Sequence, residues 1–221
     1  MSSPNQDDRP AGTEIDILVI HYTGMEDGAA ALRRLNCPAA KVSAHYLIDE
    51  AGEIHPLVAE QRRAWHAGVS HWRGRDRVND RSIGIELVNP GHAFGYRPFP
   101  RPQMAALQAL AGEVLGRHPI PPRNLLGHSD IAPARKRDPG ELFDWPGLAR
   151  AGIGLWPGDE AARSVADPSD MLDLLARFGY DTSNPEAAIK AFQRHFSPAR
   201  VDGVAGGETT RRLSRLLEMA E

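Results

Sequence analysis

Residues 15–20 read I-D-I-L-V-I, an aliphatic and β-branched run that a single aspartate interrupts. Such a run is typical of a central strand that is covered on both faces, as in α/β folds. His21 follows directly, and a polar side chain at the end of a buried strand is held rigidly where α/β folds place reactive groups. We therefore predict an α/β fold with a functional histidine at the rim of its sheet. The alternative is a histidine that merely begins a loop.

A hairpin and two helices surround this strand in the predicted fold. Residues 43–49 and 54–58 are two runs of high β propensity, separated by a turn that contains Gly52. His45 lies in the first run; a strand histidine is more often a structural residue than a ligand, and we expect this one to line the site. Residues 28–36 and 102–118 have helical periodicity, and the second helix has one apolar face that suits packing as scaffold.

A second strand-like run, residues 82–88, reads S-I-G-I-E-L-V and carries Glu86 in its middle. An unpaired carboxylate in a buried strand costs several kcal/mol, so Glu86 must face a partner or a cleft. We predict that its pKa is tuned for proton transfer. The alternative is an ion-paired structural glutamate.

Aromatic, basic and histidine side chains cluster in the loop-like segment 64–77. Exposed aromatic rings beside hydrogen-bond donors form the usual surface on which sugars and peptides lie. We expect His66 and Trp72 to contact a substrate, and Arg77 to pair with a substrate carboxylate, because a guanidinium fork matches that geometry. The alternatives are an aromatic residue that caps the core and an arginine that is a solvated surface charge.

Most of the candidate metal-binding and catalytic side chains lie in residues 127–140, which read G-H-S-D-I-A-P-A-R-K-R-D-P-G. Their prolines and glycines predict an ordered loop and not a helix. The segment offers an imidazole at His128, an ammonium at Lys136 and a carboxylate at Asp138. A catalytic zinc ion takes three protein ligands and leaves a fourth position to water. Two ligands are visible here, and a third must come from another part of the chain.

The chain changes character within residues 155–167, where we place a domain boundary. Residues 168–180, 185–196 and 208–219 have helical periodicity, which predicts a small three-helix domain. The predicted organisation is a flexible arm over residues 1–13, a larger domain over 14–157 and the helical domain over 158–221.

Composition excludes several classes of function. The formal net charge of -3 gives no electrostatic reason to expect nucleic acid or an anionic membrane as partner. Cys37 is the only cysteine, so there is no intrachain disulfide, and any metal must be bound by histidine and carboxylate. The first residues have no leader features, and no apolar run is long enough to cross a bilayer. We expect a soluble, monomeric, cytoplasmic protein, or a periplasmic one if a leader has been removed.

The order of these motifs resembles a known enzyme family. With His21 at a strand end, Glu86 in S-I-G-I-E-L and then H-S-D-I-A-P-A-R-K-R-D-P-G, residues 14–157 resemble the zinc-dependent N-acetylmuramoyl-L-alanine amidases of type 2, of the AmpD and AmiD kind. This family is related in fold to peptidoglycan recognition proteins and phage T7 lysozyme, which implies a mixed central β-sheet flanked by helices. Residues 188–196, A-I-K-A-F-Q-R-H-F, and 201–210, V-D-G-V-A-G-G-E-T-T, resemble the three-helix peptidoglycan-binding module.

The resemblance implies a site and a reaction. His21, His128 and Asp138 would bind Zn2+, and Glu86 and Lys136 would be the catalytic pair. Such enzymes hydrolyse the amide bond between the lactyl group of N-acetylmuramic acid and the L-alanine of the stem peptide. The expected partner is therefore peptidoglycan or a muropeptide, and the expected role is cell-wall turnover or muropeptide recycling.

Two departures from the T7 lysozyme branch narrow the expected mechanism. Ala44 stands where that branch has a catalytic tyrosine, which favours Glu86 as the proton carrier. Asp138 stands where that branch has a cysteine ligand, which fits the AmpD and AmiD kind. The alternatives for the first domain are a recognition protein that binds wall fragments without cutting them and a zinc peptidase that acts within the stem peptide. The alternative for the second domain is a purely structural appendage.

Overall fold

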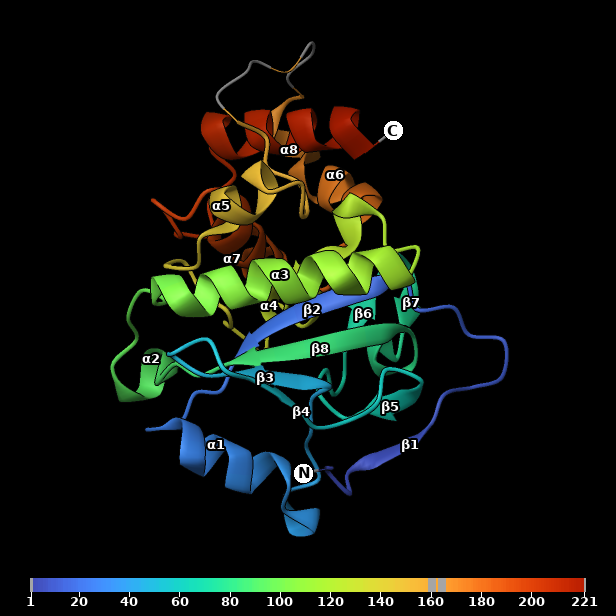
Figure 1. The fold of residues 1–221 in the computed structure, drawn as a ribbon. Coiled ribbons are helices and arrows are strands. Elements are labelled where there is room, and N and C mark those ends of the chain that lie inside the picture. Colours follow the sequence, from blue (N-terminus) through green and yellow to red (C-terminus); the bar gives the residue numbers. More distant parts are fainter. Residues whose placement is uncertain (1, 159–161, 163–165, 221) are drawn as a thin grey trace.

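The computed structural model describes residues 2–158, 162 and 166–220, and its centre is a mixed β-sheet (Figure 1). Within this sheet, neighbouring strands pair in parallel except β3 (Tyr46–Ile48) and β4 (Ile54–Pro56), which form the predicted antiparallel hairpin. The predicted fold class is confirmed. Across the sheet the five strands are β4 (Ile54–Pro56), β3 (Tyr46–Ile48), β8 (Ser82–Leu87), β2 (Ile17–Tyr22) and β9 (Leu125–Gly127).

Alternation along β2 sends its side chains into two separate cores. Leu18 and Ile20 share an apolar cluster with helix α3 (Arg101–Arg117), which crosses one face of the sheet (Figure 1). Ile17 and Val19 belong to a different cluster. Because successive side chains of a strand point to opposite faces, His21 lies on the face of Ile17 and Val19. The side chains of the site therefore start from the face that α3 does not cover.

Helix α1 (Gly28–Leu35) packs near the hairpin. Asp27 caps its first turn, since the carboxylate accepts a hydrogen bond from Ala30 N. Its buried residues Ala31 and Leu35 share an apolar cluster with Leu47 of β3. Together, α1 and α3 confirm the two helices predicted before residue 120.

The remaining elements of the larger domain are short. The expectation of a loop without helix over residues 127–140 was wrong for the first turn, where helix α4 (His128–Ile131) forms. The cause is Asp130, whose carboxylate accepts a hydrogen bond from Gly127 N at 2.7 Å and closes that turn. The short elements are β6 (His71–Trp72), β7 (Arg75–Asp76), α2 (Gly91–Phe94), α4 (His128–Ile131) and α5 (Trp145–Arg150).

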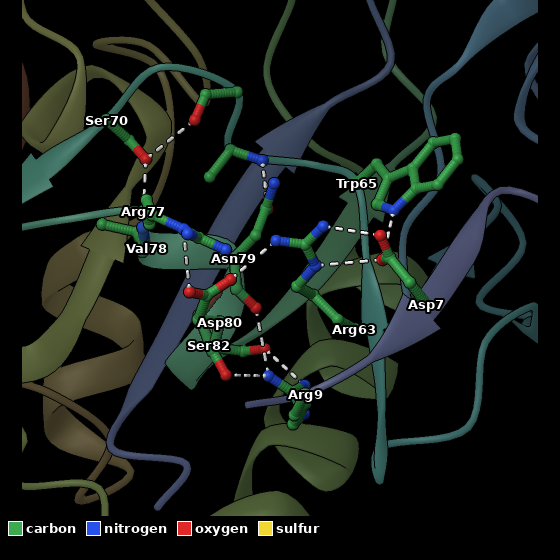
Figure 2. A network of polar contacts seen from close by, with 12 residues as sticks. Asp7, Arg9, Arg63, Trp65, Ser70, Arg77, Val78, Asn79, Asp80 and Ser82 are labelled. Carbon is green, nitrogen blue, oxygen red and sulfur yellow. Dashed lines mark hydrogen bonds and ion pairs between the residues drawn. The ribbon is translucent and has the colours of Figure 1, made fainter. Parts of the chain in front are cut away.

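Part of the segment predicted to be a flexible arm, residues 1–13, forms a strand that the sequence analysis did not predict. Strand β1 (Gln6–Asp8) pairs antiparallel with β5 (Arg62–Ala64). Asp7 accepts hydrogen bonds from Arg63 and from the indole of Trp65 (Figure 2). A polar segment that is held by ion pairs and ladder bonds has no apolar periodicity, so nothing in the sequence indicated it.

Among residues 166–220 the structure has three α-helices, as predicted, and they lie at one end of the molecule (Figure 1). Their apolar side chains do not form a separate core, because one buried cluster contains Phe178 and Phe192 together with Ile17 of β2. The domain boundary within 155–167 stays a prediction, since residues 159–161 and 163–165 lie outside the described residues. The helices are α6 (Met171–Phe178), α7 (Pro185–Phe196) and α8 (Gly207–Ala220).

Neither α3 nor any other helix in the described parts of the chain combines the length and the apolar character that crossing a membrane requires.

Arg9 joins the N-terminal segment to the sheet, and its removal tests whether that segment supports the fold. Its guanidinium donates to the backbone oxygens of four residues, Glu60, Asn79, Asp80 and Ser82. We expect Arg9→Ala to lower the free energy of unfolding by about 2–4 kcal/mol, because buried acceptors lose a charged donor. Urea denaturation measures the loss, with Arg101→Ala at an exposed position as control. Equal effects of the two variants would contradict this role of Arg9.

Candidate metal centre and catalytic cleft

Three neighbouring strands bring the predicted site residues together. β2 and β8 pair in parallel with His21 beside Glu86, so these two side chains lie on the same face of the sheet. On the other side of β2, Ile20 pairs with Gly127, the last residue of β9, and His128 follows as the first residue of α4. The carboxyl ends of parallel strands meet at one edge of the sheet, where α/β folds place functional groups.

His21, His128 and Asp138 converge on one point. The Nδ1 atoms of His21 and His128 are 2.9 Å apart, and Asp138 Oδ2 lies 3.1 Å from the first and 3.0 Å from the second. All three residues are buried. A tetrahedral ion with bonds of about 2.0–2.1 Å separates its ligand atoms by about 3.3–3.4 Å, so the triangle needs only a small expansion to accept one. The three residues form a group that is able to hold a metal ion, although their role as ligands stays a prediction.

The far nitrogen of His128 fixes the orientation of its ring. His128 Nε2 lies 3.0 Å from the carbonyl oxygen of Ala67, so Nε2 carries the proton and donates, and Nδ1 keeps its lone pair for a cation. The backbone N–H groups of His66 and Ala67 in turn donate to Oδ1 of Asn79, at 3.1 and 2.8 Å. Asn79 belongs to the network of Figure 2 and thereby holds the segment that orients His128.

A third imidazole orients His21. The Nε2 atom of His21 lies 3.0 Å from Nδ1 of His66, and Nε2 of His66 lies 3.1 Å from Ser82 Oγ. His66 fits there because Gly84 of β8 has no side chain: a Cβ atom at Gly84 would lie 2.4 Å from its ring. His66 also lines the cleft described below, as predicted for a residue of the site, although its contact with a substrate stays a prediction.

Burial and mutual contact set the charges of this cluster. Burial, followed by the neighbouring His128, lowers the pKa of His21 to about 4, so its ring is neutral near pH 7. Burial alone would raise the pKa of Asp138, but the neighbouring imidazoles of His128 and His21 hold that pKa well below its usual range. Neutral imidazole and ionised carboxylate are the forms in which these groups bind metals.

Glu86 and Lys136 line the same cleft as His128 and Asp138, which has a volume of about 780 Å³. Burial, and then repulsion by Asp138, raise the pKa of Glu86 to about 8, while Lys136 opposes the shift. Oε2 of Glu86 has no hydrogen-bond partner among the described residues. An unpaired carboxylate that faces a cleft and has a pKa near neutrality is equipped for proton transfer. Lys136 adds a positive charge at the wall of the cleft.

Trp72 does not have the position expected of a substrate contact, and that prediction was wrong. Its indole is fully buried, and its Nε1 donates to Asn124 Oδ1 at 3.0 Å. Its ring packs edge-on against Phe178 and Tyr180, which belong to the C-terminal helices and the turn after α6. A tryptophan that fills an interface between distant segments has the same sequence pattern as an exposed one, so the sequence could not distinguish them.

His45 and Arg77 also lie apart from the described lining of the cleft. His45 is fully buried; its Nδ1 accepts from the backbone N–H of Gly84, and its Nε2 contacts Arg9. It is therefore the structural histidine that was the alternative. The Arg77 side chain is mostly exposed and pairs with Asp80 at 3.0 Å (Figure 2). Arg77 is therefore engaged at the surface, and the expectation that it contacts a substrate has no support in this arrangement.

Tyr22 and His92 line the cleft but were not predicted. The hydroxyl of Tyr22 lies 2.9 Å from Nδ1 of His92, whose Nε2 is 3.2 Å from the carboxylate of Glu141. The rings of His92 and Tyr96 stack with their centroids 4.3 Å apart. These contacts join segments that are far apart in the sequence, so no local pattern indicated them.

Comparison with known proteins gives the same picture over both parts of the chain. The family described as N-acetylmuramoyl-L-alanine amidase matches residues 11–141, and the family described as putative peptidoglycan binding domain matches residues 170–213. The N-acetylmuramoyl-L-alanine amidase AmiD of Escherichia coli K12 is 41% identical over 231 residues, covering 92% of this chain and 83% of AmiD. The 1,6-anhydro-N-acetylmuramyl-L-alanine amidase AmpD of Enterobacter cloacae is 38% identical over 160 residues, covering 65% of this chain and 83% of AmpD.

Solved structures agree with this relationship. The complex of Escherichia coli AmiD with anhydro-N-acetylmuramic acid-L-Ala-D-γ-Glu-L-Lys has a TM-score of 0.83 and 40% identity, covering 96% of this chain and 92% of that chain. AmpDh3 of Pseudomonas aeruginosa has a TM-score of 0.85 and 38% identity, covering 95% of this chain and 94% of that chain. The resemblance inferred from the motifs is thereby confirmed, and the chain belongs to the family of N-acetylmuramoyl-L-alanine amidases.

Proposed function

We propose that this protein is a zinc-dependent amidase that hydrolyses the bond between the lactyl group of N-acetylmuramic acid and L-alanine in muropeptides or peptidoglycan. The observation that carries the proposal is the buried triangle of His21 Nδ1, His128 Nδ1 and Asp138 Oδ2 beside the unpaired carboxylate of Glu86. The relatives AmiD and AmpD of this protein are named as muramoyl-L-alanine amidases, and the structure of AmiD has been solved with an anhydromuropeptide. The proposed role is turnover of the cell wall and recycling of its fragments.

The donor set of the proposed metal site fits zinc. Two neutral imidazoles and one carboxylate are a ligand set of catalytic zinc sites, which keep a further position open. When bound, zinc acts as a Lewis acid that makes a water molecule nucleophilic near neutral pH and polarises the scissile carbonyl. The contacts of His21 with His66 and of His128 with Ala67 leave both Nδ1 atoms available to the ion.

Glu86 and Lys136 are the proposed catalytic pair. Glu86 accepts the proton of the attacking water through its unpaired Oε2 and then gives it to the departing nitrogen of L-alanine. Lys136 lines the cleft and stabilises the negative charge that develops on the carbonyl oxygen. Both roles use groups that face the cleft and require no rearrangement of the sheet.

The C-terminal helices are proposed to bind peptidoglycan, because residues 170–213 match the family described as putative peptidoglycan binding domain. The predicted domain limits of 14–157 and 158–221 stay part of this proposal.

Product analysis tests the reaction. We expect zinc-loaded protein to release from a defined anhydromuropeptide a stem peptide that begins with L-alanine, and we expect chelation to abolish the release and zinc to restore it. Mass spectrometry identifies both products. Cleavage within the stem peptide would instead indicate a peptidase, and no cleavage of either anhydro or reducing muropeptides would indicate a recognition protein.

Variants at the metal ligands and at the base separate binding from chemistry. We expect Asp138→Ala to lose zinc, because it removes one of three ligands. We expect Glu86→Gln to keep zinc and to lose about 10²–10⁴-fold in kcat, because it removes the proton acceptor. Metal analysis and steady-state kinetics measure the two effects. Stoichiometric zinc in Asp138→Ala would remove that residue from the ligand set.

The raised pKa of Glu86 also predicts a pH-dependent cost to stability. The pKa rises from 4.5 to about 8 on folding, so the metal-free protein binds a proton on folding between these values and its stability falls as the pH rises through this window. We expect Glu86→Gln to gain stability relative to the wild type across the window, by about 1–3 kcal/mol at its upper end. Thermal unfolding of the metal-free proteins at several pH values measures the gain.

Glu60 is a control, because its substitution by glutamine should change the stability in the opposite direction. Burial would raise its pKa, but hydrogen bonds from Arg117, His118 and Tyr46 lower it from 4.5 to about 2. Its stabilising contribution is therefore present above the ordinary pKa and is lost as the pH falls through about 2. Glu60→Gln should be less stable than the wild type near pH 7, and the difference should shrink in acid. If Glu86→Gln and Glu60→Gln changed the free energy of unfolding near pH 7 in the same direction, the opposite pKa shifts of the two residues would be contradicted.

A further inference from the structure

Asp130 is a buried carboxylate with no part in the proposed chemistry. It lies in α4, two residues after His128, and it is fully buried. Its Oδ2 accepts hydrogen bonds from Gly127 N and from Nδ1 of His195, both at 2.7 Å. Its Oδ1 accepts one from the hydroxyl of Tyr180, also at 2.7 Å. Two of its three donors therefore come from the C-terminal part of the chain, which the sequence presented as a separate module.

Packing holds both C-terminal donors in place. The ring of Tyr180 packs edge-on against Trp72, with centroids 5.2 Å apart. Burial, and then the neighbouring carboxylate of Asp130, raise the pKa of Tyr180 well above its usual range, so its hydroxyl stays protonated and donates. The ring of His195 is stacked between Trp145 and Phe196, with centroid distances of 3.7 and 3.8 Å. Neither donor is free to leave Asp130 without loss of an aromatic contact.

Asp130 in turn shapes the turn that presents the metal ligands. Its bond to Gly127 N fixes the residue directly before His128. The next residue, Ser129, donates its backbone N–H to the carbonyl oxygen of Asp138 at 2.9 Å. Gly127 itself lies so close to Pro139 that a Cβ atom would be 2.6 Å from the proline ring. The first turn of α4 and the segment around Asp138 are thus held against each other.

We propose that the C-terminal helices position the metal centre through Asp130, with Tyr180 and His195 as positioning residues that touch neither metal nor substrate. The physical basis is that a carboxylate with no exposed surface needs its donors, and a loss of donors is relieved by movement of the turn that bears it. That turn also bears His128. This inference rests on the proposed function, because it assumes that His128 and Asp138 bind zinc.

The first test compares two Tyr→Phe substitutions. Tyr180→Phe removes the hydroxyl that donates to Asp130, and Tyr46→Phe removes a hydroxyl that donates to Glu60, also at 2.7 Å, in a part of the sheet outside the described cleft lining. We expect Tyr180→Phe to raise the zinc dissociation constant about tenfold, in the range for residues that orient metal ligands, and Tyr46→Phe to leave it unchanged. Competition with a chromophoric chelator measures both constants on the full chain.

The second test separates the hydrogen bond of His195 from its ring stacking. Leucine and asparagine have nearly the same shape, and only asparagine offers an N–H group near the place of Nδ1. Both His195→Asn and His195→Leu lose the stacked ring, so both should lose thermal stability. We expect zinc affinity to fall further in His195→Leu than in His195→Asn. Raised zinc should restore amidase turnover in Tyr180→Phe and His195→Leu with KM unchanged, because only the occupancy of the site is impaired.

The possible results distinguish this inference from the proposed function. If the wild-type protein binds no zinc, the proposed function fails and this inference fails with it. If the wild type binds zinc and Tyr180→Phe matches Tyr46→Phe in affinity, or His195→Leu matches His195→Asn, the network is only a packing contact between the two parts of the chain. A loss of affinity in Tyr180→Phe that raised zinc reverses supports positioning.

Discussion

The site depends on the parallel register of three strands, β8, β2 and β9. This register places Glu86 beside His21 and places the end of β9 so that His128 follows at the same edge. A slip of one residue in β2 would turn His21 toward the core under α3. The apolar residues of β2 prevent such a slip, because they must alternate between two different cores. The side chains of the site are thus held in place by apolar residues that take no part in the proposed reaction.

Four carboxylates in the interior or at the cleft differ in how completely they are paired, and the difference marks a candidate functional group. Glu60 has three donor side chains, Asp130 has three donor groups, and Asp138 meets two imidazoles. Glu86 lines the cleft, and its Oε2 has no hydrogen-bond partner among the described residues. An unpaired carboxylate oxygen at the wall of a cleft is one that a bound ligand can satisfy.

The sequence predicted the features that repeat along the chain or that belong to a family motif. Alternation and helical periodicity predicted the central strands and the helices α1, α3 and α6 to α8. The motif order predicted that His21 would join His128 and Asp138, although His21 lies far from them in the chain. Trp72 and His45 were misplaced because burial against a distant segment leaves no local signal. The sequence analysis also missed the N-terminal strand, because the polar contacts that stabilise this segment are made with distant residues, 60–82.

Gly84 shows how much of the proposed metal site depends on the absence of a side chain. The space above this glycine is filled by the ring of His66, whose Nδ1 meets Nε2 of His21. A proton on Nε2 of His21 is what frees the opposite nitrogen for a cation. The tautomer of His21, a proposed metal ligand, therefore depends on the absence of a side chain at Gly84 in the neighbouring strand. A single methyl group at Gly84 would displace the ring of His66 and so remove the contact that sets the tautomer of His21.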